Sequence, residues 1–301
     1  MTGPESGAER TAGPARRAAL EQAVTDEVVA SFAHARTERF TELMSSLVRH
    51  LHAFARDVRL TQPEWEAAIA FLTATGQTCT DKRQEFILLS DVLGLSMQTV
   101  GINAASSQAA TESTVFGPFF VEGSPRIELG GDIAEGVSGR PCYVSGRVLD
   151  DTGAPISGAR VELWEADDEG FYDVQYGGDR MQARGHLFSG DGGAYRFWSV
   201  LPAPYPIPYD GPVGQLLDAA NRSPMRPAHI HFMVKAPGCR TLITHIFVAG
   251  SPHLTDDAVF AVKPSLVVDF VEHPPGTAPD GRVLDGPWHE ASFDLVLART
   301  R

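Results

Sequence analysis

Apolar residues recur every three or four positions through the first third of the chain, which is the spacing of an amphipathic helix. One stripe begins at Leu20, and a second runs from Phe40 to Val58. With short connections between the predicted helices, residues 20–105 are expected to form a compact helical unit. Ordinary core packing explains most of these stripes, but part of them could serve a contact between subunits.

Helix ends are marked further along the same region. The motif Thr61-Gln-Pro-Glu64 has the form of a capping box with proline in the first turn, and it predicts a third helix that ends at Gly76. Asp81 is the predicted N-cap of a fourth helix that continues to Val100.

From about residue 114 the pattern changes to short β-prone runs separated by glycine, proline and aspartate. Strands at this spacing are typical of an antiparallel β-sandwich, and no helical period alternates with them as a parallel sheet would require. The predicted strands cover residues 141–149, 159–164, 194–198, 229–234, 242–248 and 293–297. We therefore expect an α+β protein with a disordered tail over residues 1–18, an N-terminal helical domain over 19–112 and a β-sandwich domain over 113–301.

Composition narrows the possible partners and the compartment. The chain of 301 residues carries a formal charge of −13, which argues against nucleic acid or anionic lipid headgroups as main partners. Its three cysteines, Cys79, Cys142 and Cys239, are widely spaced and are expected to be free thiols in a reducing cytoplasm. There is neither an apolar run of the ~18 residues that cross a bilayer nor a signal peptide, so we do not expect a membrane protein.

The segment Arg226-Pro-Ala-His-Ile-His231 carries the most chemistry. In an extended strand, residues two apart point to the same face, so His229 and His231 could bind one metal ion. For an isolated motif of this kind, a pair of surface or hydrogen-bonded histidines is the alternative.

Two tyrosine-bearing segments favour the metal. Gly170-Phe-Tyr172 lies in a loop after a predicted strand, and in Leu201-Pro-Ala-Pro-Tyr-Pro-Ile-Pro208 prolines fix the backbone on both sides of Tyr205. Either tyrosine alone could be an ordinary packing residue. With the histidines they form a set of two phenols and two imidazoles. Phenolates are hard anionic donors, and two of them with one hydroxide neutralise a ferric ion, so the set predicts Fe(III).

With these motifs in place, the chain resembles a known family, the intradiol ring-cleavage dioxygenases. The resemblance runs from about residue 20 to the C-terminal region and rests on the combination GAxVELWxA…GFY, LPAPYPIP and RPAHIH. It implies that the iron is held by Tyr172, Tyr205, His229 and His231. Tyr176 is a nearby alternative to Tyr172, but it lacks the Gly-Phe lead-in.

The resemblance also implies an architecture and a mechanism. The helical domain would hold a homodimer, with a phospholipid in an apolar tunnel at the dimer interface, and the β-sandwich would be the catalytic domain. A catechol would bind the iron as a dianion and displace one tyrosinate, by position Tyr205. O2 would then attack the activated ring, which opens to a muconate-type diacid. Arg226 would be the cation that stabilises charge developing on the ring, with a surface salt bridge as its alternative role.

Within the family, the loop Ser113-Thr-Val-Phe-Gly-Pro-Phe119 is similar to the hydroxyquinol-cleaving subgroup, and so is His245, where catechol enzymes usually carry Gln. The pocket-lining pattern of that subgroup falls here on Leu88, Asp91, Val115, Phe116, Gly117, Pro118, Phe119, Ile207, Pro208, Arg226, His245 and Val259. Asp91 is the most informative of these, because a carboxylate can accept a hydrogen bond from a third ring hydroxyl.

We therefore expect an enzyme of aromatic catabolism that opens hydroxyquinol (benzene-1,2,4-triol) with O2. The product would be 3-hydroxy-cis,cis-muconate, the tautomer of maleylacetate. A catechol or chlorocatechol 1,2-dioxygenase is the alternative within the class. A non-enzymatic β-sandwich binding module that does not use iron is the alternative outside it.

Overall fold

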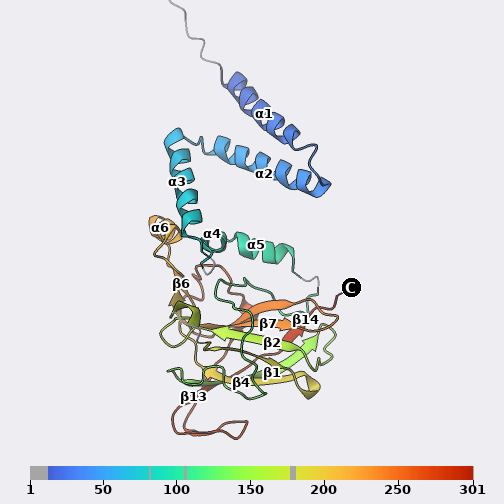
Figure 1. The fold of residues 1–301 in the computed structure, drawn as a ribbon, viewed down its shortest axis with the longest axis vertical. Coiled ribbons are helices and arrows are strands. Elements are labelled where there is room, and N and C mark those ends of the chain that lie inside the picture. The colour runs from blue at the N-terminus through green and yellow to red at the C-terminus, as the bar shows by residue number, and fades with distance from the viewer. Residues whose placement is uncertain (1–12, 81–82, 105–106, 177–180, 301) are drawn as a thin grey trace, which may run out of the picture. The chain divides into compact units, whose positions relative to one another are not determined.

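The computed structural model describes residues 13–80, 83–104, 107–176 and 181–300 (Figure 1). The chain divides into two compact units, one up to Thr73 and one from Ala74 onwards. The expected α+β fold, with helices followed by a β-sandwich, is confirmed.

The first unit contains α1 (Pro14–Ser31), α2 (Glu38–Asp57) and most of α3 (Gln62–Thr78). Helix α1 starts within the stretch that was expected to be a disordered tail over residues 1–18. Pro14 stands in its first turn, and the alanines and arginines that follow favour a helix, so the tail prediction is wrong from Pro14 onwards. Residues 1–12 lie outside the described residues.

Helices α1 and α2 contact each other through polar side chains. Thr25 Oγ1 lies 3.0 Å from His52 Nδ1 and accepts a hydrogen bond from Arg56 Nη1 at 2.8 Å, and Arg59 forms a bidentate pair with Glu21. The predicted apolar stripe of α2 is instead about half exposed, at 49–55% for each of Phe40, Leu43, Leu47, Leu51, Phe54 and Val58. The stripe is therefore not the core of this unit.

Half of the predicted capping box at the start of α3 is present, because the Glu64 carboxylate accepts a hydrogen bond from the N–H of Thr61 at 2.8 Å. The Thr61 hydroxyl also donates to this carboxylate at 2.8 Å. Helix α3 runs to Thr78, two residues beyond the end predicted at Gly76.

The predicted fourth helix is wrong as a single element. It is two helices, α4 (Glu85–Val92) and α5 (Leu95–Ile102), because Gly94 adopts a left-handed φ of +73° between them. Both helices belong to the second unit and not to a four-helix unit with α1. Asp81, the predicted N-cap, lies outside the described residues.

Two five-stranded sheets form the second unit in the described part of the chain. One sheet contains β10 (Val271–His273), β13 (Trp288–Ser292), β1 (Pro141–Asp150), β14 (Leu295–Leu297) and β4 (Ala194–Val200). The other contains β3 (Arg184–Phe188), β2 (Arg160–Glu165), β7 (His229–Lys235), β8 (Leu242–Val248) and β9 (Val267–Val268). Smaller elements are β5 (Tyr205–Pro206) with β6 (Met225–Arg226), β11 (Gly276–Thr277) with β12 (Val283–Leu284), α6 (Pro212–Ala219), η1 (Asp173–Gln175), η2 (Asp191–Gly193) and η3 (Pro264–Leu266).

The inner faces of these sheets form the main core, with fully buried side chains such as Val144, Leu163, Phe197, Phe232 and Ile246. Each of the six predicted strands is present in whole or in part. The pairing is mixed and not purely antiparallel, because β13 and β14 run parallel to β1 and β9 runs parallel to β8. Apolar and polar residues alternate with the same period in parallel and antiparallel strands, so the sequence pattern could not show which strands pair in parallel.

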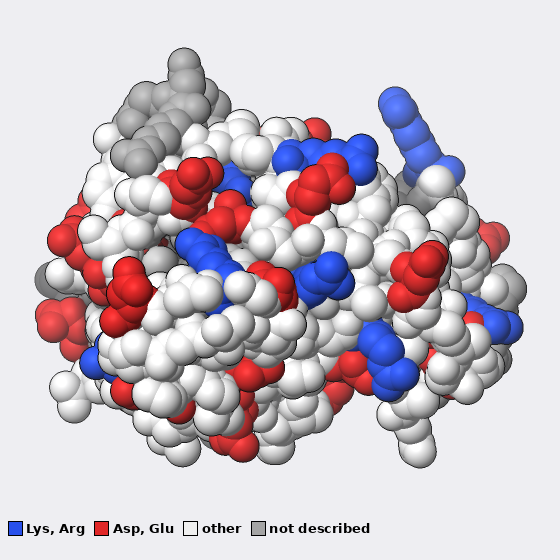
Figure 2. All heavy atoms as spheres, turned by 90° about the horizontal axis from the view of Figure 1, so that it is seen from below, with Lys and Arg blue, Asp and Glu red and all other residues white. Residues whose placement is uncertain are grey.

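Other sequence predictions concern cysteines, charge and membranes. Cys79, Cys142 and Cys239 are free thiols. On the face in Figure 2, acidic side chains are scattered among neutral and basic ones, with no basic patch. In the described residues no single helix is long and apolar enough to cross a membrane. The bent pair α4 and α5 passes that test by length and composition only, and its Leu88, Leu89 and Val92 are buried in the protein.

Candidate functional site

Strand β7 carries the two predicted histidine ligands on one face. Ile230 and Phe232, which alternate with them, are fully buried in the sandwich core. His229 and His231 therefore point away from that core, and their Nε2 atoms lie 3.2 Å apart. The structure brings the two imidazoles together as the strand pattern predicted.

The two predicted tyrosines reach the same place from separate loops. Strand β5 pairs with β6 so that Tyr205 lies opposite Arg226, and Tyr172 stands at the start of η1. The two phenol oxygens are 3.1 Å apart. Tyr172 Oη lies 3.0 Å from His231 Nε2, and Tyr205 Oη lies 3.5 Å from His229 Nε2. Four potential ligand atoms thus form one cluster.

Glycine at position 170 allows the tyrosine segments to approach. Gly170 has a φ of +85°, and a Cβ added to it would lie 2.8 Å from Tyr205 Cβ, closer than side chains can pack. Tyr176, the alternative to Tyr172, is 57% exposed, and its hydroxyl donates to Asp167 Oδ2 at 2.5 Å. The structure therefore places Tyr172, and not Tyr176, in the cluster.

The cluster fits a metal ion. Its four side chains are at most 3% exposed. Burial lowers the pKa of His229 and His231 well below the usual value, so both imidazoles are neutral and offer lone pairs. Burial raises the pKa of Tyr172 and Tyr205, so these phenols need a nearby cation in order to ionise. The charge of Arg226 lowers the pKa of both phenols, but burial outweighs it, so a metal ion at the cluster would favour their ionised form.

A third imidazole stands beside the cluster. His245 lies opposite His231 in the pairing of β7 and β8, with ring centroids 4.1 Å apart. Ligand atoms of His229, His231 and His245 all lie within 4.8 Å of one another. His245 Nδ1 is 2.5 Å from Thr114 Oγ1, whereas its buried Nε2 has no partner in the described chain. His245 was expected to contact substrate, and its unpaired nitrogen leaves that role open.

The two strand histidines are oriented by different means. His229 Nδ1 donates to the carbonyl of Pro227 at 2.7 Å, which leaves the Nε2 lone pair facing the cluster. The buried Nδ1 of His231 has no such partner among the described residues. Its ring instead stacks on Trp164 at 4.6 Å and 17°, because Trp164 is its cross-strand neighbour on β2. Trp164 lies in the VELW motif, but only strand pairing reveals this contact.

Arg226 is held at the cluster by an ion pair that the sequence did not reveal. Its Nε donates to Asp257 Oδ1 at 3.1 Å, with both side chains at most 3% exposed. Its Nη1 lies 3.1 Å from His229 Nε2 and 3.5 Å from Tyr205 Oη. Burial lowers the pKa of Arg226, but the charge and hydrogen bond of Asp257, together with Tyr205 and Tyr172, raise it by more in total, so the arginine remains a cation. Its Nη2 has no partner in the described part of the chain.

A cavity of about 590 Å³ lies beside the cluster, and five of the twelve predicted pocket residues line it. Phe119, one of its walls, stacks on Tyr172 with ring centroids 4.4 Å apart. The predicted residues that line this cavity are Leu88, Pro118, Phe119, Ile207 and Pro208.

The other predicted pocket residues lie deeper or to the side. A Cβ on Gly117 would be 3.2 Å from His231 Cε1, so this loop passes directly over a histidine of the cluster. Phe116, about a third exposed, packs on Trp164, while Val115 and Val259 are buried.

Asp91 is 3% exposed on α4, and burial raises its pKa. A hydrogen bond from Ser96 and the charge of Arg226 act in the opposite direction and lower that pKa.

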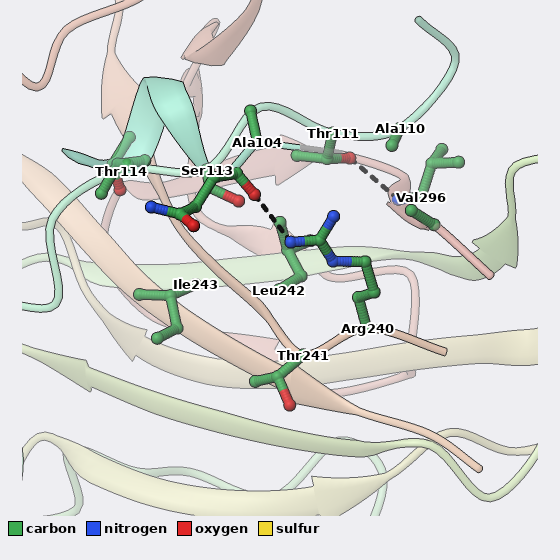
Figure 3. A pocket seen from close by; sticks show the side chains of 13 residues that line it. Ala104, Ala110, Thr111, Ser113, Thr114, Arg240, Thr241, Leu242, Ile243 and Val296 are labelled. Atoms are coloured by element: carbon green, nitrogen blue, oxygen red, sulfur yellow. Dashed lines mark hydrogen bonds between the residues drawn. The ribbon is translucent and has the colours of Figure 1, made fainter. Parts of the chain in front are cut away.

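A smaller cavity of about 180 Å³ is lined by Thr114 (Figure 3). The Thr114 hydroxyl contacts His245 Nδ1. Leu242 and Ile243 also form part of the cavity wall, and Arg240 crosses the cavity to donate to the carbonyl of Asn103 at 2.6 Å. The larger cavity is the candidate substrate site, because its walls include Phe119, which stacks on Tyr172, and Pro206, which follows Tyr205 in the chain.

Comparison with known proteins identifies the family and the fold. A family model described as "Dioxygenase" matches residues 115–298, and one described as "Catechol dioxygenase N terminus" matches residues 37–111. The chain is 60% identical to hydroxyquinol 1,2-dioxygenase of Rhodococcus opacus over 283 residues, which cover 93% of this chain and 94% of that protein.

Solved structures of similar proteins agree with this family assignment. Hydroxyquinol 1,2-dioxygenase from Pseudomonas putida has a TM-score of 0.87 and 45% identity, covering 94% of this chain and 100% of that one. Catechol 1,2-dioxygenase from an Acinetobacter species has a TM-score of 0.78 and 32% identity, with 93% of each chain covered. Fold, site and these matches define the class of protein as a dioxygenase. More particularly, the chain belongs to the intradiol ring-cleavage dioxygenase family, which confirms the resemblance drawn from the sequence.

Proposed function

We propose that the protein opens hydroxyquinol with O2, between two hydroxyl-bearing carbons, to 3-hydroxy-cis,cis-muconate and its tautomer maleylacetate. The main support is the buried cluster of two phenols and two imidazoles next to a cavity of about 590 Å³. Asp91, buried on the α4 side of this site, supplies an acceptor for the third hydroxyl that distinguishes hydroxyquinol from catechol.

The proposed cofactor is Fe(III), held by Tyr172, Tyr205, His229 and His231. Anionic phenolate oxygens favour the ferric state and offset its charge in a buried site. When bound, the ion would supply the Lewis acidity that draws electron density from the substrate ring.

Three side chains near the cluster have proposed roles in the reaction. Tyr205 Oη is the proposed acceptor of a substrate hydroxyl proton, because it is the phenol next to the fixed cation Arg226. Arg226 stabilises negative charge that develops on the ring, and its unpaired Nη2 can donate to a substrate oxygen. The stack of Phe119 on Tyr172 excludes water from that side of the cluster.

One preparation tests both proposals. The purified protein should contain about one iron per chain and show a visible tyrosinate-to-iron absorption band. Oxygen uptake should be faster on hydroxyquinol than on catechol or 4-chlorocatechol. Tyr172→Phe and Tyr205→Phe should shift the band and abolish turnover, while the matched control Tyr176→Phe, on an exposed tyrosine of the same loop, should change neither. A colourless wild-type protein that cleaved catechols in the presence of an iron chelator would contradict this assignment.

We also propose that the first unit forms a homodimer, that its half-exposed apolar stripes bind a phospholipid tail there, and that the enzyme works in the cytoplasm. The stripes from Phe40 to Val58 support the first two points, because apolar side chains left this exposed are buried by a partner or a ligand. A boundary between helical and catalytic domains near residue 112 remains part of this proposal.

A further inference from the structure

The C-terminal end of α4 is held by an arginine from a distant part of the chain. Helix α4 ends at Val92, and the last carbonyls of a helix have no partners within it. Arg222 Nη1 donates to the carbonyl of Val92 at 2.6 Å. A cation at this end of a helix is favourable both as a charged hydrogen bond and against the helix dipole.

The same guanidinium also holds a second segment. Arg222 Nη2 donates to the carbonyl of Ala258 at 3.0 Å, and its Cζ lies 4.8 Å from the centroid of the Phe260 ring. One side chain therefore bridges the end of α4 and the segment around Ala258. The planar guanidinium makes the two contacts through two separate nitrogens held in a fixed geometry, whereas a lysine would have to make both through one.

The bridged segment, residues 257–261, is a tight turn that we call the Asp257 turn. Asp257 Oδ2 accepts from Ala261 N at 2.9 Å, and its carbonyl accepts from Phe260 N at 3.1 Å. Phe260 has a φ of +59°, an unfavourable conformation for a bulky residue that persists only where the surroundings hold it. A Cβ on Gly94 would lie 3.6 Å from Phe260 Cδ2, so this ring rests against the break between α4 and α5.

Each bridged carbonyl is next to a residue of the proposed substrate site. Val92 follows Asp91, which is the proposed acceptor of the third hydroxyl. Ala258 lies between Val259 of the predicted pocket and Asp257, which is the ion-pair partner of Arg226. Burial is the main cause that raises the pKa of Asp91; the charge of Arg226 lowers this pKa and the charge of Asp257 raises it.

We infer that Arg222 is a positioning residue for substrate discrimination. It fixes the distance between α4, which carries Asp91, and the Asp257 turn, which anchors Arg226, so that one substrate can meet both charged groups. The inference rests on the proposed function, and it assigns Arg222 no contact with substrate.

The test compares two arginines that close helix ends. Arg222→Gln removes the bridge, and the matched control Arg240→Gln removes a similar 2.6 Å bond to the carbonyl of Asn103 at the end of α5, away from the larger cavity (Figure 3). The readout is the ratio of kcat/KM for hydroxyquinol to kcat/KM for catechol, which a loss of stability alone would not change. Arg222→Gln should lower this ratio by about 10-fold, as expected when a charged hydrogen bond to substrate is misplaced, whereas Arg240→Gln should leave it unchanged.

Two further measurements make the test specific. In an Asp91→Ala background, Arg222→Gln should have no further effect on the ratio, because the carboxylate that Arg222 positions is already absent. In metal-free protein, hydrogen exchange at the backbone amides of residues 88–93 should accelerate in Arg222→Gln and only partly in Arg222→Lys, which keeps the charge and one contact. If Arg222→Gln does not fold, Arg222→Lys takes its place in the measurement of the substrate ratio.

The inference would be overturned if Arg222→Gln lowered kcat/KM equally for both substrates. It would also be overturned if hydrogen exchange in residues 88–93 became faster without a change in the ratio, or did not change at all. An equal fall of the ratio in Arg240→Gln would overturn it as well. A wild-type preference for catechol would overturn the proposed function and the inference with it, and this failure is distinguishable because it is seen before any variant is made.

Discussion

Removing the charge of Asp257 should destabilise the protein through Arg226. In Asp257→Asn the amide has one oxygen and one NH2 group, whereas the carboxylate accepts from both Arg226 Nε and the N–H of Ala261. One of these donors must therefore lose its acceptor. Arg226 is also left as a buried cation without its ion-pair partner.

The size of the effect follows from burial. Both side chains are at most 3% exposed, so solvent cannot replace the lost interaction. Breaking a buried ion pair on one side typically costs about 3–5 kcal/mol. That is a large part of the roughly 5–15 kcal/mol by which a domain is stable, so the variant should fold but unfold at clearly lower urea concentration.

The assay is urea unfolding at pH 7 with a chelator present, so that metal binding does not add to stability. Tryptophan fluorescence reports on the sandwich, which contains Trp164, Trp198 and Trp288. The matched control is Asp256→Asn, at a neighbouring carboxylate whose side chain is 54% exposed; it should change the free energy of unfolding by no more than about 0.5 kcal/mol.

A double-mutant cycle identifies the cause. In an Arg226→Met background no cation remains to be left unpaired, so Asp257→Asn should cost less than about 1 kcal/mol there. If the two substitutions were additive within about 0.5 kcal/mol, Asp257 would act through its own turn and not through Arg226, and the reasoning would be refuted.

Two other features give predictions of their own. Burial raises the pKa of Glu165, which accepts a hydrogen bond from Ser199, to about 8. Because the folded pKa is above the unfolded one, the stability that protonated Glu165 contributes is fully present below about pH 4.5 and is lost as pH rises through 8. The free energy of unfolding of Glu165→Gln, measured with urea, should therefore rise relative to that of wild type by up to about 1.4 kcal/mol per pH unit over this range. A difference between the two proteins that did not change with pH would contradict the raised pKa. For the dimer, Leu47→Glu places a charge in the exposed stripe of α2 and should give a monomer at micromolar concentration by light scattering, with Arg39→Glu, at a polar and exposed position of the same helix, as control. A wild-type monomer, or an equal effect of both variants, would argue against the stripe as the interface.

Local pattern predicted part of the centre of the site. The alternation around His229 and His231 defines which face they share, and the prolines around Tyr205 indicate a rigid segment. The full set of four ligands, however, came from the resemblance to the dioxygenase family. The strands at 141–149 and 229–234 were predictable from local pattern, because each has a long β-prone run.

Most of the features that the sequence did not reveal depend on contacts between distant segments. Asp257 is 31 residues from Arg226 in a loop without any periodic pattern. The break at Gly94 was hidden because a glycine within a helix costs only about 1 kcal/mol, so the apolar period continues through it. The parallel neighbours of β1 and the stack of Trp164 on His231 are decided by strand pairing, which single-strand patterns do not encode.

The register of β7 has a consequence for how the centre forms. His231 faces Trp164 on β2 and His245 on β8, and all three positions are set by backbone pairing on both sides of one central strand. A slip of one residue would turn Ile230 outwards and bury both imidazoles among aliphatic side chains, at a cost far above that of any loop rearrangement. Folding of the sheet therefore creates the geometry of the histidine pair before any metal ion binds. We therefore expect metal binding to be fast and to need no global refolding. The surrounding loops can also change during evolution, for new aromatic substrates, without disturbing the histidine pair.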